Sequence, residues 1–174
     1  MNDFNVGAGV KAARKLLMTF VNVGDAGKQE WELVGSGVEE SALELNPNTE
    51  TVTDILGVTT TSVTKWEPNQ SLDPNTVKGG SKLNFKLHKI WQDKTPELLS
   101  QFDVMIVYAY LGTEAAFEAE MQKNCTINIT SIGGSAYVDM PIKIMYSNDS
   151  VKGTVSIKDG VPTFSPVAAA AAAE

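Results

Sequence analysis

The order of apolar and polar residues predicts a chain made mostly of short β-strands. Residues 16–23 (LLMTFVNV) and 103–111 (DVMIVYAYL) are apolar and rich in β-branched or aromatic residues, and turn-forming residues separate such runs. Residues 103–111 form the most apolar run, which indicates a central buried strand. Shorter runs predict further strands at residues 30–34, 41–47, 125–132, 136–146 and 151–157.

One segment, residues 46–68 (NPNTETVTDILGVTTTSVTKWEP), is β-prone but does not divide into an apolar and a polar face. A strand that covers an ordinary core shows one face of each kind. Gly57 interrupts the run, so we expect two strands joined as a hairpin. Alternate residues place Glu50, Val52, Asp54 and Leu56 on one face and Thr49, Thr51, Thr53 and Ile55 on the other.

The hydrophobic period changes in the middle of the chain. Residues 69–80 are typical of a long polar loop, and residues 81–94 (SKLNFKLHKIWQDK) place apolar side chains at helical spacing. Strand-like alternation is also present there, but the length and the lysines favour a helix, with Ser81 as its N-cap. A short helical turn follows at residues 95–102. The helical face is formed by Leu83, Leu87, Ile90 and Trp91.

The predicted fold class is therefore mainly β: an antiparallel β-sandwich or barrel with one flanking α-helix. Asn148 and Asp149 form a turn between the last two strands. We expect three parts: an N-terminal arm at residues 1–15, one β-sandwich domain at residues 16–166, and a low-complexity tail at residues 167–174.

Composition limits the classes of function. The chain has 174 residues, 43% of them hydrophobic, which is enough for one domain with a real core. Its net charge is −7, and only one of its 14 basic residues is arginine, which argues against a nucleic-acid-binding protein. No segment has the pattern of a signal peptide or of a membrane span, so we expect folding in a reducing cytosol.

Candidate catalytic chemistry is sparse. His88 is the only histidine and Cys125 the only cysteine, and they lie 37 positions apart, which gives little support to a metal site or a nucleophile–base pair. Residues 7–12 (GAGVKA) loosely match a dinucleotide-binding fingerprint, but no βαβ unit follows them. We therefore predict no catalytic residue, no cofactor and no metal, and a protein that is not an enzyme.

Charge is distributed unevenly along the chain. Residues 29–64 contain seven acidic residues and neither lysine nor arginine, whereas the helical segment is rich in lysine. Opposite faces of the molecule are therefore expected to carry opposite charge. The acidic segment is either an ordinary solvated surface or the lining of a space that must not retain a polyanion.

The chain resembles the major tail tube proteins of long, non-contractile phage tails, a siphophage-type family whose fold is shared with the type VI secretion tube. The resemblance extends over about residues 16–164 and rests on the order and spacing of four blocks. These blocks are LLMTFVNVG…EWELVGSGVEESALELNPNTETVTDILG, SLDPNTVKGGSKLNFKLHKIW, VMIVYAYLG and GGSAYVDMPIKI.

The resemblance implies a structural subunit that polymerises as stacked hexameric rings around a negatively charged lumen, through which double-stranded DNA enters the host. Residues 44–64 would then form part of the inner wall, one hairpin face toward the lumen and the other packed on the sandwich. Glu44, Glu50 and Asp54 are the implied lumen-facing residues. The 69–80 loop and the terminal arms would join rings and become ordered on assembly; the implied contacts are Glu67, Asp73, Pro74, Asn75 and Lys78.

The implied partners are other copies of the chain, tail-tip or initiator and tail terminator proteins, and a tape measure protein and DNA that pass through the lumen without specific binding. No membrane partner is expected, and the protein would be part of the virion tail, assembled in the host cytoplasm. Two other classes stay open. One is a tube subunit of a contractile tail, a phage-tail-like bacteriocin or a secretion machine. The other is a monomeric β-sandwich binding module for sugar or peptide.

Overall fold

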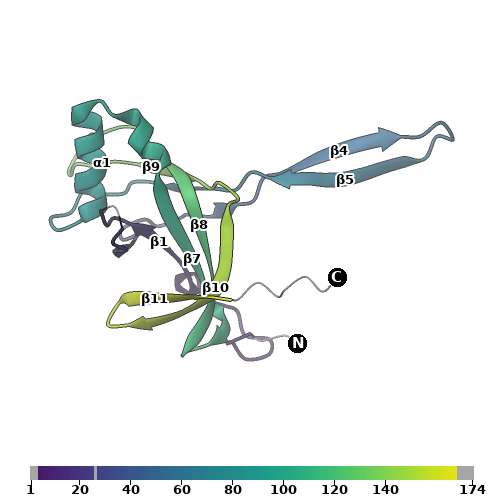
Figure 1. Ribbon diagram of the computed structural model, residues 1–174, viewed down its shortest axis with the longest axis horizontal. Coiled ribbons are helices and arrows are strands. Elements are labelled where there is room, and N and C mark those ends of the chain that lie inside the picture. Colours follow the sequence, from purple (N-terminus) through teal and green to yellow (C-terminus); the bar gives the residue numbers. More distant parts are fainter. Residues whose placement is uncertain (1–3, 26, 168–174) are drawn as a thin grey trace.

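The computed structural model describes residues 4–25 and 27–167, and these contain fourteen helices and strands (Figure 1). Eleven are strands, so the predicted mainly β class is confirmed. In chain order they are η1 (Arg14–Leu16), β1 (Leu17–Asn22), β2 (Trp31–Leu33), β3 (Leu43–Glu44), β4 (Pro47–Thr53), β5 (Thr59–Trp66), β6 (Asn69–Leu72), α1 (Lys82–Asp93), η2 (Pro96–Ser100), β7 (Phe102–Thr113), β8 (Ala116–Ile129), β9 (Ile142–Met145), β10 (Ser150–Lys158) and β11 (Val161–Pro166).

Nine of the described strands form one curled antiparallel sheet, in the order β2-β1-β7-β8-β9-β6-β3, with β10 and β11 attached beside β8. The long strand β8 is the branch point of this sheet. Its first half pairs with β10, from Phe117 opposite Val155 to Gln122 opposite Ser150. Its second half pairs with β9. The sheet therefore divides along β8 and wraps around a core, as expected for a sandwich or barrel with a flanking helix (Figure 1).

Strand β7 lies at the centre of the sheet and is buried on both faces, as its sequence predicts. Phe102, Val104 and Ile106 point into the larger core, which α1, β6 and β9 also supply. Met105 and Val107 point the other way, into a smaller core that includes residues of β10 and β11. The alternation of strand side chains thus places one strand between two apolar clusters.

Helix α1 begins and ends close to the predicted residues. The Ser81 hydroxyl accepts a hydrogen bond from the Asn84 amide (3.2 Å), so Ser81 is the N-cap, and Lys94 ends the helix in a left-handed conformation. Leu83, Leu87 and Ile90 are buried as predicted. Trp91 was expected on the same face but is 56% exposed, and the Lys94 ammonium lies 3.2 Å from its ring centroid.

Three expected boundaries are wrong. Residues 69–80 are not one loop, because residues 69–72 form β6 between β9 and β3, where Leu72 enters the core and Gln70 is buried. Strand β8 begins at Ala116 rather than near residue 125, and the expected strand at 136–146 shortens to β9. Strand β11 was not predicted at all. The short helical turn is confirmed as η2.

The expected separation of charge is also wrong where β2 meets α1. Glu30 forms an ion pair with Lys82, and the Glu32 carboxylate lies at the start of α1. Acidic residues of the 29–64 segment therefore contact the lysine-rich helix rather than lie on an opposite face. No helix in the described part of the chain combines the length and apolar character that crossing a membrane requires.

Candidate functional site

The hairpin of β4 and β5 is the most unusual feature of the surface. The two strands pair with each other, within the described chain they pair with no third strand, and every residue of both strands is exposed. The hairpin projects from the body as a long arm (Figure 1). The predicted hairpin is confirmed, whereas the expectation that one of its faces packs on the sandwich is wrong.

Threonine side chains hold the hairpin together along one face. The hydroxyls of Thr51 and Thr61 are 3.0 Å apart, as are those of Thr53 and Thr59. A two-stranded ribbon of this kind is at best marginally stable in water, because neither face is covered. Within the described residues, the arm is held by its own hydrogen bonds and by neither a third strand nor a core.

The tip of the hairpin is a tight, hydrogen-bonded turn. The Asp54 carboxylate accepts hydrogen bonds from the amides of Leu56 (2.8 Å) and Val58 (2.9 Å), and the Gly57 amide donates to the Asp54 carbonyl (3.0 Å). Gly57 has a φ of 79°, as the last residue of a type I turn with a bulge requires. The turn holds Ile55 and Leu56 at its outer corners.

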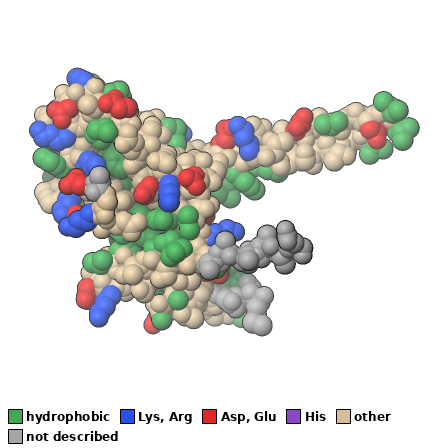
Figure 2. All heavy atoms as spheres, viewed as in Figure 1, with side chains coloured by type: hydrophobic (Ala, Val, Ile, Leu, Met, Phe, Trp, Pro, Cys, Tyr) green, Lys and Arg blue, Asp and Glu red, His purple; other side chains and the backbone are tan. Residues whose placement is uncertain are grey.

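Those two corner residues are apolar and face solvent. Ile55 is completely exposed and Leu56 is 83% exposed, and Val52 and Val58 beside them are more than half exposed. Figure 2 shows apolar side chains gathered at the far end of the arm. Turn corners are usually polar, so a pair of exposed aliphatic residues there is unusual for a surface turn.

An apolar groove of about 390 Å³ lies beside α1. Residues before the helix and on its first turns form one side, and residues between β8 and β9 form the other. His88 and Lys78 are at its margin, and no carboxylate belongs to the described lining. The apolar side chains are those of Val77, Phe85, Ile132, Val138 and Met140.

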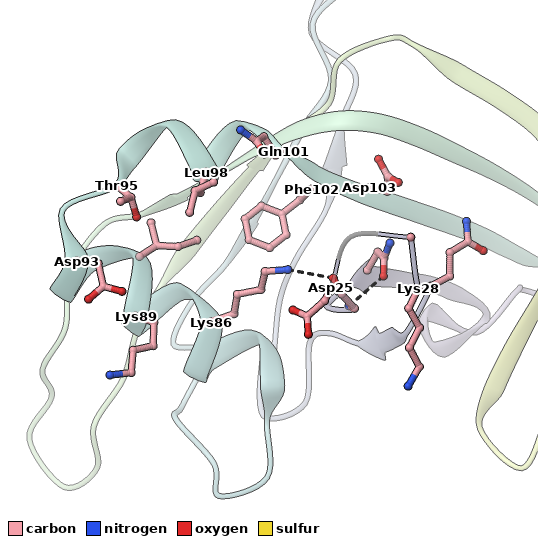
Figure 3. A pocket seen from close by; sticks show the side chains of 15 residues that line it. Asp25, Lys28, Lys86, Lys89, Asp93, Thr95, Leu98, Gln101, Phe102 and Asp103 are labelled. Carbon is pink, nitrogen blue, oxygen red and sulfur yellow. Dashed lines mark hydrogen bonds between the residues drawn. The ribbon is translucent and has the colours of Figure 1, made fainter.

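A hollow of about 700 Å³ lies between the turn after β1, α1 and the start of β7 (Figure 3). Lys86 extends from α1 across it and donates to the Gly24 carbonyl (3.2 Å). Charges of both signs surround it, and neither histidine nor cysteine is among its described lining residues. The hollow therefore lies at a junction between the helix and the turn, which the Lys86 side chain bridges.

The residues implied to face a lumen are not brought together in one subunit. Glu44 is exposed on the edge strand β3, Glu50 is exposed on β4, and Asp54 is engaged in the tip turn. Their role as lumen-facing residues stays a prediction.

The residues implied to join rings are mostly bonded within the subunit. The side-chain amide of Asn75 donates to the Met140 carbonyl (2.8 Å), and the Lys78 ammonium donates to the Ser36 hydroxyl (2.7 Å). Glu67 forms an ion pair with Lys65 (2.5 Å). Asp73 and Pro74 are exposed. An intersubunit role for this set stays a prediction.

The remaining chemical candidates gain no catalytic partner. Cys125 is fully buried, and burial raises the pKa of its thiol to about 11, so it is not ionised at neutral pH. His88 is exposed at the groove. In residues 4–25 and 27–167, no group of three or more histidine, cysteine or acidic side chains could hold a metal ion.

The apolar tip is the candidate feature that the sequence analysis missed. A signal was present, because Ile55 and Leu56 directly precede the turn-forming Gly57, where polar residues are usual. The alternation of residues 49–56 predicts strand faces for Ile55 and Leu56 instead.

The fold is similar to that of two chains from an extracellular contractile injection system. One belongs to the PVC sheath-tube complex in its extended state, with a TM-score of 0.52 and 14% sequence identity; the match covers 85% of this chain and 95% of that one. The other belongs to the PVC sheath/tube terminator in its extended state, with a TM-score of 0.52, 15% identity, and coverage of 84% and 99%. The chain therefore has a tail-tube-like fold. No protein-family model and no curated protein matches its sequence.

Proposed function

We propose that this protein is a structural subunit that assembles with copies of itself into a tail tube. The observation that carries the proposal is the β4–β5 arm, whose strands and apolar tip are exposed in the described part of the chain. The tail-tube-like fold supports the same reading. A non-enzymatic role agrees with the buried, protonated thiol of Cys125 and with the sparse chemistry of the surface.

Assembly explains why such an arm is retained. A free ribbon exposes unpaired backbone groups along both edges, which invites uncontrolled pairing with other chains. In a ring or a tube, neighbouring subunits pair with these edges and cover the apolar tip. The arm then gains the third strand and the buried surface that it lacks in the monomer.

Within this function, we place the protein in the tube of a long, non-contractile phage tail, as stacked hexameric rings in a virion assembled in the host cytoplasm. Glu44, Glu50 and Asp54 would then line a negative channel for a tape measure protein and DNA. Tail-tip and terminator proteins would begin and end the tube. The resemblance of the four sequence blocks supports this placement.

A second placement is a tube subunit of a contractile injection machine. The two similar structures come from such a system, and this observation favours it. The two placements differ in one partner, because a contractile machine surrounds its tube with a sheath. A sheath protein that co-purifies with the assembled tube would favour the second placement, and bare tubes in complete particles would favour the first.

The test is assembly of the purified protein, measured by light scattering and negative-stain microscopy over a wide range of concentration. We expect hollow tubes or rings from the intact chain. A variant in which residues 50–62 are replaced by Asn-Gly retains a hairpin turn and should stay a monomer that still unfolds cooperatively on heating. Intact protein that stays monomeric, and that joins no particle in the producing cell, would contradict the proposal.

A further inference from the structure

We propose that the apolar groove beside α1 is the receptor for the hairpin tip of a second copy of this chain. The inference rests on the proposed self-assembly and adds to it a specific pair of surfaces. The tip contributes Ile55 and Leu56, and the groove contributes Val77, Phe85 and Val138.

The two surfaces match in size and chemical character. At about 390 Å³, the groove falls in the range of pockets that enclose drug-sized ligands, which are larger than two aliphatic side chains. Phe85 is 66% exposed and Val138 is 54% exposed, so both sides of the contact now face water and both would lose apolar exposed area on docking.

Charge also favours this pairing. The arm carries Glu50 and Asp54 toward its tip, and its basic residue, Lys65, lies near its root. The groove has Lys78 at its margin and no carboxylate in its described lining. The arm therefore brings its carboxylates to a groove whose described lining holds a lysine and no carboxylate. The adjacent Asp139 carboxylate accepts a hydrogen bond from the Thr76 hydroxyl (2.7 Å).

The positions of the two surfaces decide which copy can bind. The arm points away from the body on the side opposite α1, so a tip cannot reach the groove of its own subunit (Figure 1). Docking is therefore head-to-tail between different copies. When each tip enters the groove of the next copy, that copy's own tip stays available for a third, and the repetition gives a ring or an open polymer.

The tip is preorganised for such a contact. The hydrogen bonds of Asp54 to Leu56 and Val58 fix the turn before docking, so little conformational freedom is lost there. A two-residue anchor buries far less than the roughly 1,200 Å² of a specific, stable interface, so one contact alone is weak. Assembly then depends on many such contacts at once.

Site-directed disulfide formation between separate variants tests the pairing. Leu56→Cys is mixed with Val138→Cys, which is in the groove, or with Trp91→Cys, which is on α1 outside the described groove lining and equally exposed. The native Cys125 is buried and serves as a silent background. We expect a disulfide-linked heterodimer from the groove pair and little from the Trp91 pair. Equal yields from both pairs, or dimers of Leu56→Cys alone, would overturn the inference.

A second variant pair uses assembly as the readout. Phe85→Ala should raise the concentration needed for assembly about tenfold, as expected for an aromatic anchor, while Trp91→Ala leaves it within about twofold. Both residues are exposed, so both variants should fold. Equal effects of the two changes would contradict a role for the groove.

The experiments separate failure of this inference from failure of the proposed function. Tubes from the intact protein without the Leu56–Val138 disulfide would leave the tube function in place and show that the tip docks elsewhere. If the intact protein forms no tubes and the variants form no disulfide, both the proposed function and this inference are contradicted.

Discussion

Removal of the Glu32 carboxylate should destabilise the folded subunit measurably. Glu32 lies on β2, and its carboxylate accepts hydrogen bonds from the Ser81 hydroxyl (2.6 Å) and from the amides of Lys82 and Leu83 (both 2.9 Å). The first amides of a helix have no partner within the helix, and the N-terminal end of its dipole favours a negative charge. Glu32 thus connects the sheet to α1 by a charge-assisted cap.

The magnitude follows from these contacts. Hydrogen bonds to a charged group contribute about 1.5–3 kcal/mol net, and water that reaches the exposed Lys82 recovers part of this on removal. We expect Glu32→Ala to lower the free energy of unfolding by about 2 kcal/mol, which lowers Tm by about 4–8 °C in a chain of this size. Glu32→Gln keeps an acceptor but loses the charge, so its loss should be about 1 kcal/mol.

Thermal unfolding followed by circular dichroism measures this effect. The 50–62 replacement is the suitable background, because assembly would otherwise raise Tm by mass action. Glu40→Ala is the control, since Glu40 is exposed and forms no side-chain hydrogen bond within the described chain. A Tm for Glu32→Ala within about 1 °C of the control would refute the capping role.

Two further predictions concern titration and charge. Burial raises the pKa of the Cys125 thiol to about 11, so the unfolded chain releases this proton at a lower pH than the folded chain. The free energy of unfolding should therefore fall by up to about 2–3 kcal/mol from pH 9 to 11. Cys125→Ala should flatten that slope in denaturant titrations. In the proposed phage tail, Glu44→Lys combined with Glu50→Lys should slow DNA release, more strongly at low salt, and normal ejection at both salt levels would mean that these carboxylates face elsewhere. Asp54 stays unchanged in that variant because it holds the tip turn.

Two of the elements that form the core, β7 and α1, were predictable from the sequence. β7 carries apolar side chains toward two clusters, and α1 has a helical spacing of buried leucines and its own cap at Ser81. Both signals are local in the sequence, because an apolar strand, a helical spacing and an N-cap each involve residues only a few positions apart. β6 was missed because its Gln70 is polar and yet buried, held by hydrogen bonds from Thr19 and Tyr146 that are distant in sequence.

The candidate site was predictable only in part, for a related reason. Sequence patterns identified the β4–β5 hairpin, but a pattern does not show whether a strand is covered by its own subunit or by another. The roles of two acidic residues are likewise not visible in the sequence. Glu32 and Asp54 look like surface charge in the sequence, whereas one caps a helix and the other closes a turn.

The edge strand β11 shows which surfaces remain open for strand addition between copies. The Val167 amide donates to the Lys152 carbonyl on β10 (3.0 Å), so the even-numbered residues of β11 direct their backbone nitrogens to the free edge. Two of these are Pro162 and Pro166, which have no amide hydrogen, and Phe164 is left as the one donor along that edge of the strand. A neighbouring strand could not form a continuous ladder there. Strand addition is thus discouraged at β11, whereas the β4–β5 arm, in which Pro47 is the one proline, retains its amide donors.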